Sequence, residues 1–116
     1  NGKDGLHTVS KHSTIGETIR IMNKEGVDQL PVVEGNEFVG SVTTSALIEK
    51  IINDPSIKDK SVGEIMDNPM QVVALDSTLD VLSSLLNKNN KALLVRDEQD
   101  KAHIITQHDI LKAIKK

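Results

Sequence analysis

The sequence contains no cysteine, tryptophan or tyrosine, and its only aromatic residue is a single phenylalanine. Without cysteine, disulfides, thiolate nucleophiles and zinc–thiolate sites are excluded, and the composition fits a cytoplasmic protein. Without aromatic side chains there is no platform on which nucleic-acid bases could stack, which argues against nucleic acid as a partner. The core must therefore be aliphatic, built from Ile, Leu and Val.

An excess of charge of one sign and long apolar runs are also missing. The chain has 14 Lys and Arg against 17 Asp and Glu, a net charge of −3, and the two signs are interspersed. No apolar run approaches the length of a membrane span, and the first ten residues, "NGKDGLHTVS", do not form a signal peptide. Because there is no initiator Met, we expect an excised domain. Its 116 residues, 37% of them hydrophobic, suffice for one globular unit with a core.

Both halves of the chain carry the same order of segments, with a period of roughly sixty residues. In the first half, Thr14 and Glu17 can form a capping box that opens an amphipathic helix, and Gly26 can end it. In the second half, Thr78 opens the corresponding helix, which we expect over 77–90. Short strands are expected at 8–9, 29–33, 38–42, 71–74, 91–95 and 102–105, with terminal helices at 44–52 and 107–114 after Thr43 and Thr106.

The segment between the halves carries a further helix signal, since Ser61 and Glu64 have the spacing of a capping box over a short helix. We therefore divide the chain into a first repeat at 1–54, a linker with a short helix at 55–68, and a second repeat at 69–116. Neither repeat could bury its sheet and helices alone. The predicted fold is α+β, with two β-α-β-β-α repeats packed with pseudo-twofold symmetry and two equivalent clefts between them.

The stretch "IITQHD" at 104–109 is an apolar strand that leads into Thr, two further residues and then Asp. Together with "LPVV", "FVGSV" and the repeat, it resembles the tandem CBS-domain pair, or Bateman module, over essentially the whole chain. "GVDQLPVV" and "HIITQHDIL" are also similar to the C-terminal regulatory region of the cystathionine β-synthase family of pyridoxal-phosphate enzymes. The resemblance implies a module that binds an adenosine-containing ligand, S-adenosylmethionine or AMP, and regulates an attached catalytic domain that this chain does not contain.

Thr106 and Asp109 suit a nucleoside chemically. An ionised Asp only accepts hydrogen bonds, and a ribose offers two adjacent hydroxyl donors. A Thr at a helix start lies among free backbone N–H groups. The alternative is structural: Thr106 caps the helix and Asp109 merely complements the helix dipole. The first-repeat equivalent of this Asp is Ala46, which cannot hold a diol, so we expect one ligand per chain.

The resemblance also assigns base-binding residues. By position these are Gly5, Leu6, His7 and Thr8 ahead of the first helix, and Val27, Asp28 and Gln29 before "LPVV". Leu6, Val27 and Ile104 would sandwich the adenine. Asp28 is either a turn residue or a cleft residue; in the cleft it would attract a sulfonium and repel a polyphosphate, which favours S-adenosylmethionine over ATP.

The sequence predicts neither a metal site nor a catalytic site. His7, His12, His103 and His108 lie on separate elements without paired spacing, so no metal site is predicted. Ser83 and Ser84 have no base beside them, so no catalytic residue is predicted.

The sequence therefore predicts a regulatory module without its own cofactor or enzymatic activity, and a homodimer that meets through its helices. Two helices carry more apolar residues than a single core-facing stripe needs: Ile21 beside Ile19 and Met22, and Val81 beside Leu82. A wide core face is the alternative explanation for these residues. The alternative function is a ligand-free structural or dimerisation module.

Overall fold

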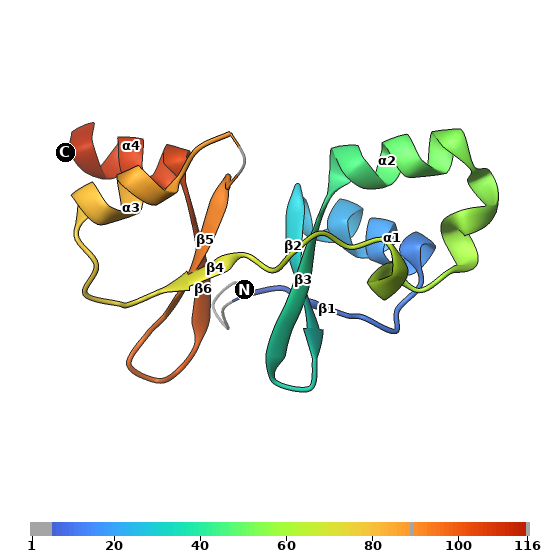
Figure 1. Cartoon of the computed structure of the whole chain (residues 1–116), viewed down its shortest axis with the longest axis horizontal. Coiled ribbons are helices and arrows are strands. Elements are labelled where there is room, and N and C mark those ends of the chain that lie inside the picture. The colour runs from blue at the N-terminus through green and yellow to red at the C-terminus, as the bar shows by residue number, and fades with distance from the viewer. Residues whose placement is uncertain (1–5, 89, 116) are drawn as a thin grey trace. The chain divides into compact units, whose positions relative to one another are not determined.

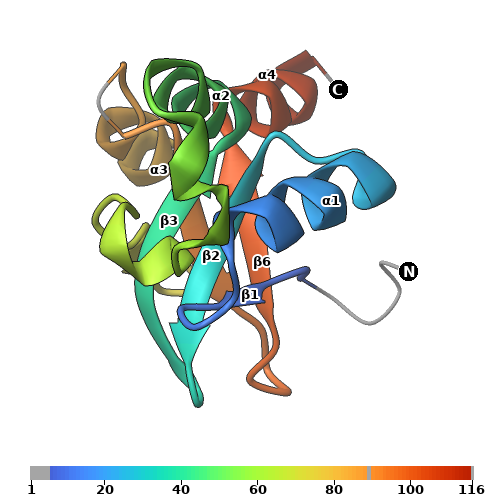
Figure 2. The same cartoon turned by 90° about the vertical axis from the view of Figure 1, so that its right-hand side faces the viewer.

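The computed structural model describes residues 6–88 and 90–115, which fall into two compact units. One unit is His7–Pro69, and the other contains Leu6 and the chain from Met70 onward. In each unit two α-helices lie on the same face of a three-stranded sheet (Figures 1 and 2). The predicted α+β class and the repeated β-α-β-β-α order are confirmed.

The first unit orders its strands β1-β2-β3, with β1 parallel to β2 and β3 antiparallel to it. Its elements are β1 (Val9–Ser10), α1 (Ile15–Glu25), β2 (Gln29–Glu34), β3 (Glu37–Thr43) and α2 (Thr44–Asn53). The predicted capping box is present in α1: the Thr14 N–H donates to Glu17 Oε1 at 2.8 Å, and the Glu17 N–H donates to Thr14 Oγ1 at 3.0 Å. Gly26 ends α1 with φ at 67°, a conformation that glycine adopts without strain.

The second unit repeats this topology in the order β4-β5-β6. Its elements are β4 (Gln71–Val73), α3 (Leu79–Leu85), β5 (Ala92–Arg96), β6 (Ala102–Thr106) and α4 (Gln107–Lys115). Thr78 caps α3 as predicted, accepting a hydrogen bond from the Val81 N–H. The paired strand residues of the two units are related by a shift of 63 positions, because Gln29 pairs with Thr43 and Ala92 pairs with Thr106.

The predicted helix over 77–90 is too long. It ends at Leu85, and Leu86 is already extended. Asn87 and Asn90 instead exchange two backbone hydrogen bonds, and the Asn90 side chain donates to the Leu85 carbonyl at 3.0 Å. Asn side chains compete for backbone groups in this way, which favours a turn over a further helical turn.

The segment at 55–68 packs against the first unit rather than standing free. It contains two short 3₁₀ helices, η2 (Pro55–Asp59) and η3 (Val62–Glu64). The predicted capping box at Ser61 is wrong, because no side-chain cap hydrogen bond forms and the Ser61 hydroxyl donates to Glu64 Oε2 at 3.3 Å. Asp67 then pairs with Ser41 at the edge of β3.

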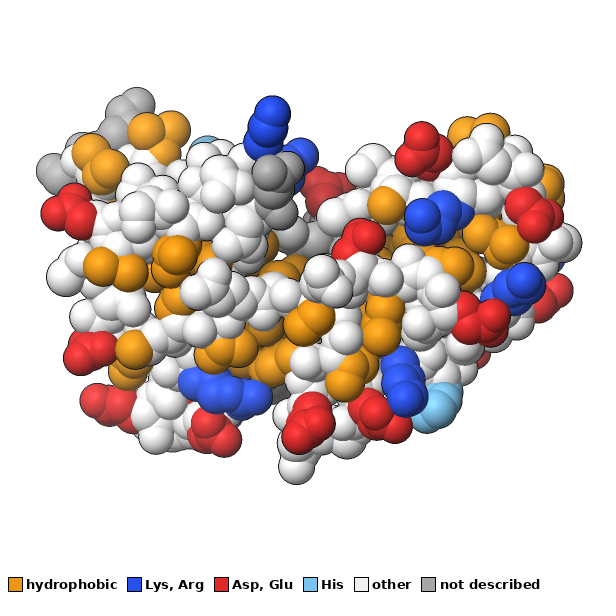
Figure 3. Space-filling view, in the orientation of Figure 1, with side chains coloured by type: hydrophobic (Ala, Val, Ile, Leu, Met, Phe, Trp, Pro, Cys, Tyr) orange, Lys and Arg blue, Asp and Glu red, His pale blue; other side chains and the backbone are white. Residues whose placement is uncertain are grey.

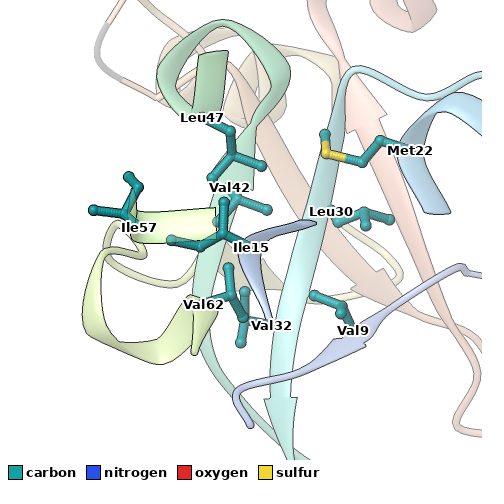
Figure 4. Close-up of a cluster of buried hydrophobic side chains, with 9 residues drawn as sticks. All are labelled: Val9, Ile15, Met22, Leu30, Val32, Val42, Leu47, Ile57 and Val62. Carbon is teal, nitrogen blue, oxygen red and sulfur yellow. The ribbon is translucent and has the colours of Figure 1, made fainter. Parts of the chain in front are cut away.

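The core of the first unit lies between its sheet and its helices (Figure 4). It is aliphatic apart from Met22, as the composition predicts, and contains Val9, Ile15, Met22, Leu30, Val32, Val42, Leu47, Ile57 and Val62. Ile19 and Ile21 pack against it, so the wide core face accounts for the apolar excess on α1. The second unit has a smaller cluster of Leu82, Leu86, Leu93 and Ile110, with Val73, Leu85 and Ile105 packed against it.

Candidate functional site

The predicted Thr106–Asp109 corner lies where β6 ends and α4 begins. Asp109 Oδ2 accepts hydrogen bonds from the Thr106 N–H at 2.9 Å and from the Thr106 hydroxyl at 3.1 Å. Thr106 Oγ1 in turn accepts from the Asp109 N–H at 3.4 Å. The two residues thus form a reciprocal cap of the kind that Thr14 and Glu17 form on α1.

This geometry makes the structural and the ligand-binding interpretations compatible. Both hydrogen bonds to the Asp109 carboxylate reach Oδ2, and within residues 6–88 and 90–115 none reaches Oδ1. A carboxylate has acceptor sites on both oxygens, and Asp109 is exposed while Thr106 is half-buried. The cap therefore fixes the carboxylate while leaving one oxygen able to accept hydroxyl donors.

The surface beside the corner is apolar. Side chains alternate across a strand, and Ile105 packs into the core with its pairing partner Leu93. Ile104 and its partner Leu94 consequently face away from α3 and α4. Ile104 is half-buried and lies two residues before Thr106, and its contact with an adenine stays a prediction.

The equivalent corner of the first unit keeps the cap but lacks the carboxylate. Thr43 Oγ1 accepts a hydrogen bond from the Ala46 N–H at 3.2 Å. The Asp28 carbonyl accepts from the Thr44 N–H at 2.9 Å, which joins the α1–β2 turn to the start of α2. Within the first unit, Asp28 therefore acts through its backbone as a turn residue, while its side chain is exposed.

The residues expected to bind the base belong to different elements of the two units. Gly5 lies outside the described residues, and Leu6 is half-buried. His7 Nε2 lies 3.4 Å from Glu25 Oε1 at the end of α1. Val27 packs against the first core, and Gln29 pairs with Thr43 in the sheet. Their approach to Thr106 stays a prediction.

Lys91 was not predicted from the sequence as a site residue. By the 63-residue shift it is the second-unit equivalent of Asp28, so the charge beside the two corners is reversed. It directly precedes Ala92, which pairs with Thr106, and its side chain is exposed. Aligning the two halves on their strand pairing would have identified it.

Shifted pKa values are found for carboxyl groups outside the Thr106–Asp109 corner. A hydrogen bond from the His103 side chain, followed by backbone N–H groups of the β5–β6 hairpin, lowers the pKa of Asp97. The distance from His103 Nε2 to Asp97 Oδ2 is 2.9 Å. The Thr14 cap, through its backbone and then its side chain, lowers the pKa of Glu17. In the described residues, no group of three or more His, Cys, Asp or Glu side chains could hold a metal ion.

Figure 3 shows the distribution of charged and apolar side chains on one face. Side chains of both charges are scattered over it, with apolar side chains between them. Among the helices of residues 6–88 and 90–115, none combines the length and the apolar character needed to cross a bilayer.

The two units repeat the same β-α-β-β-α order, with a capped strand–helix junction at the end of each sheet. The family model for the CBS domain matches twice, over residues 3–53 and 62–116. The chain therefore belongs to the CBS domain family and contains a CBS pair, a regulatory module rather than a catalytic domain.

Curated relatives are much longer than this chain. An uncharacterized protein of Methanocaldococcus jannaschii is 29% identical over 92% of this chain and 36% of its own length. Cystathionine beta-synthase of Dictyostelium discoideum is 25% identical over 94% of this chain and 23% of its length. Inosine-5'-monophosphate dehydrogenase of M. jannaschii is 31% identical over 90% of this chain and 21% of its length. The chain thus spans about a third or less of these relatives.

Solved structures share the fold over nearly the whole chain. A putative signal-transduction protein with CBS domains from Burkholderia ambifaria is 26% identical with a TM-score of 0.80, covering 96% of this chain and 83% of that one. CBSX2, a CBS-pair protein from Arabidopsis thaliana solved in complex with AMP, is 25% identical with a TM-score of 0.75, covering 97% of this chain and 91% of that one.

Proposed function

We propose that this CBS pair binds one adenosine-containing ligand per chain at the Thr106–Asp109 corner. The observation that carries the proposal is the Asp109 carboxylate, whose orientation is fixed through Oδ2 while Oδ1 accepts no hydrogen bond from the described residues. Ribose hydroxyls would donate to it, and Ile104 would lie against the base. A group held in its bound orientation before the ligand arrives loses less entropy on binding.

The ligand class is an AMP-like nucleotide or S-adenosylmethionine. CBSX2, which has this fold, was solved with AMP. Lys91 next to the corner adds a positive charge that favours a phosphate, whereas Asp28, if it lies at the same site, favours a sulfonium. Comparing the three affinities for AMP, ATP and S-adenosylmethionine separates these electrostatic contributions.

We further propose that ligand binding regulates a catalytic domain in the same polypeptide, of the cystathionine β-synthase kind. The similarity of the chain to part of Dictyostelium cystathionine beta-synthase supports this assignment. The comparable similarity to inosine-5'-monophosphate dehydrogenase makes a different attached enzyme the competing assignment.

Calorimetric titration of an Asp109→Ala variant tests the site. Removing charge-assisted hydrogen bonds to the ribose costs roughly 1.5–3 kcal/mol, so affinity should fall about tenfold or more. Glu17→Ala is the matched control, because it removes an equivalent cap from α1 without touching the proposed site. Equal affinities of Asp109→Ala and the unmodified chain would remove Asp109 from the site.

A ligand-free dimerisation module is the second candidate function. Large apolar side chains are exposed on the two terminal helices, Ile48 and Ile52 on α2, and Leu111 and Ile114 on α4. Exposed apolar side chains on neighbouring helical turns are typical of an interface. A stable dimer that produces no binding heat with any of the three ligands would favour this function over the first.

A further inference from the structure

The loop before α1 is covered by the segment that follows α2. The Ile15 N–H donates to the Lys60 carbonyl at 2.9 Å, the Val62 N–H to the Ser13 carbonyl at 2.7 Å, and the Gly63 N–H to the Lys11 carbonyl at 2.9 Å. In Figure 1, η2 and η3 lie beside α1 and the end of β1. The backbone of residues 57–63 is thus hydrogen-bonded to the backbone of the loop before α1.

Side chains complete this cover. Ile57 and Val62 are both buried and belong to the same core cluster as Ile15, which is fully buried. A Cβ at Gly63 would lie 3.0 Å from the Lys11 carbonyl oxygen, so a glycine allows the backbones to approach closely. The covering segment therefore has a simple sequence pattern: the aliphatic residue Ile57, four intervening residues, and then Val62 and Gly63.

The second unit has the same loop, and no segment of the described residues covers it in this way. The Ser77 N–H donates to the Ala74 carbonyl at 3.1 Å, as the Ser13 N–H does to Ser10 at 3.0 Å. Leu75, Ser77 and Leu79 are the equivalents of Lys11, Ser13 and Ile15, by the 64-residue shift that relates the capping residues Thr14 and Thr78. Within the described residues, no hydrogen bond is made to the Leu75 or Ser77 carbonyls or by the Leu79 N–H.

The apolar side chain at the start of α3 is exposed, whereas its first-unit equivalent is covered. Leu79 is 43% exposed, whereas Ile15 at the equivalent position is 0% exposed. Leu75, in the loop that precedes α3, is also exposed. The same backbone groups and the same helix start are therefore present in both units, but among residues 6–88 and 90–115 a segment is bound to them only in the first unit.

We infer that the surface of Leu75 and Leu79 is a docking site for a polypeptide segment of the same chemistry as residues 57–63. The occupant carries an aliphatic side chain and a Val-Gly pair, pairs with the loop through its backbone, and is basic. Asp76 and Asp80, both exposed, stand where the first unit has His12 and Gly16, so Lys residues such as Lys58 and Lys60 complement this surface. This inference does not depend on ligand binding at Thr106.

A synthetic peptide with the sequence of residues 55–66, titrated into the isotope-labelled full chain, tests the site. The expected result is a set of amide shifts centred on residues 74–80. Leu79→Ser in the chain and Val62→Asp in the peptide should each weaken binding about tenfold, because each removes one buried aliphatic contact. Ile114→Ser is the control, since it removes an exposed aliphatic side chain from α4 and should leave the affinity unchanged.

Because Leu79 is partly exposed, Leu79→Ser should leave the fold intact. The circular dichroism spectrum and the thermal melt of the variant check this. Shifts confined to residues 11–15 would mean that the peptide only replaces the chain's own segment, and would overturn the inference. Equal affinity for the Leu79→Ser chain, or no shift at any residue at millimolar peptide, would overturn it as well.

Discussion

A single carboxylate can cap a helix and bind a ligand when its two oxygens are used separately. At the Thr106 corner, Oδ2 of Asp109 accepts from the backbone and the hydroxyl of Thr106. At Ala46 in the first unit the cap survives and the carboxylate does not. Residue identity at this position therefore distinguishes the two corners, while the local backbone is the same.

Gly40 controls how the 66–68 segment packs against β3. A Cβ at this position would collide with the Met66 side chain and lie 2.9 Å from the Asp67 carbonyl oxygen. Gly40→Ala should therefore destabilise the chain by about 1–3 kcal/mol, measured by urea denaturation. Gly16→Ala is the control: its nearest neighbour is a carbonyl oxygen at 3.4 Å, and alanine favours a helix, so stability should be unchanged or slightly higher. Equal stability of Gly40→Ala and the unmodified chain would contradict this packing.

The Asp97–His103 pair predicts a pH effect at the β5–β6 hairpin. Because the pKa of folded Asp97 is lowered, first by the His103 hydrogen bond, its stabilising contribution is present above the unfolded pKa of about 3.9. The contribution is lost as pH falls through the folded pKa. His103→Gln should raise the pKa of Asp97 toward its usual value, as measured by carboxyl-carbon NMR titration. An unchanged pKa of Asp97 would show that the backbone N–H groups alone lower it.

At the scale of elements, the sequence predicted the helix starts better than the helix ends. The caps at Thr14, Thr43 and Thr78 are side-chain signals that act over three residues, and all three form. The end of α3 depends on the Asn87–Asn90 turn, which the periodic spacing of leucines does not predict. The packing of residues 55–68 was missed for a related reason: tertiary contacts of Ile57 and Val62, not local propensity, fix it.

The site itself was predictable only in part. Thr106, Asp109 and Ile104 form one corner because they are close in sequence, and strand alternation then orients them. Lys91 required the pairing of Ala92 with Thr106, a contact between strands that no local motif specifies.

The two equivalent helices should differ in local stability. The first, α1, has 11 residues, buries Ile15, Thr18 and Met22, and is covered by η2. The second, α3, has seven residues and buries only Leu82 within its bounds. Native-state hydrogen exchange should therefore be slower in α1 than in α3, because opening α1 exposes more core. Equal or greater protection of α3 would contradict this ranking and would indicate a cover over Leu79 already in place.

At the scale of the whole molecule, the exposed side chains of α2 and α4 predict self-association. A stable interface buries roughly 1,000 Å² or more, and Ile48, Ile52, Leu111 and Ile114 supply apolar contact area on both terminal helices. Ile52→Ser combined with Ile114→Ser should shift a dimer toward monomer in sedimentation velocity across a concentration series. Leu75→Ser, which removes an exposed side chain from the loop before α3, is the control. A monomer at every concentration of the unmodified chain would exclude this interface.

The central claim is that one corner, and not its repeat, binds an adenosyl ligand. Isothermal titration of the unmodified chain with AMP, with S-adenosylmethionine as the parallel ligand, measures the stoichiometry directly. The account predicts one ligand per chain and loss of that ligand in Asp109→Ala, because Ala46 leaves the other corner without an acceptor for the ribose hydroxyls. Two ligands per chain, or one that persists in Asp109→Ala, would contradict it.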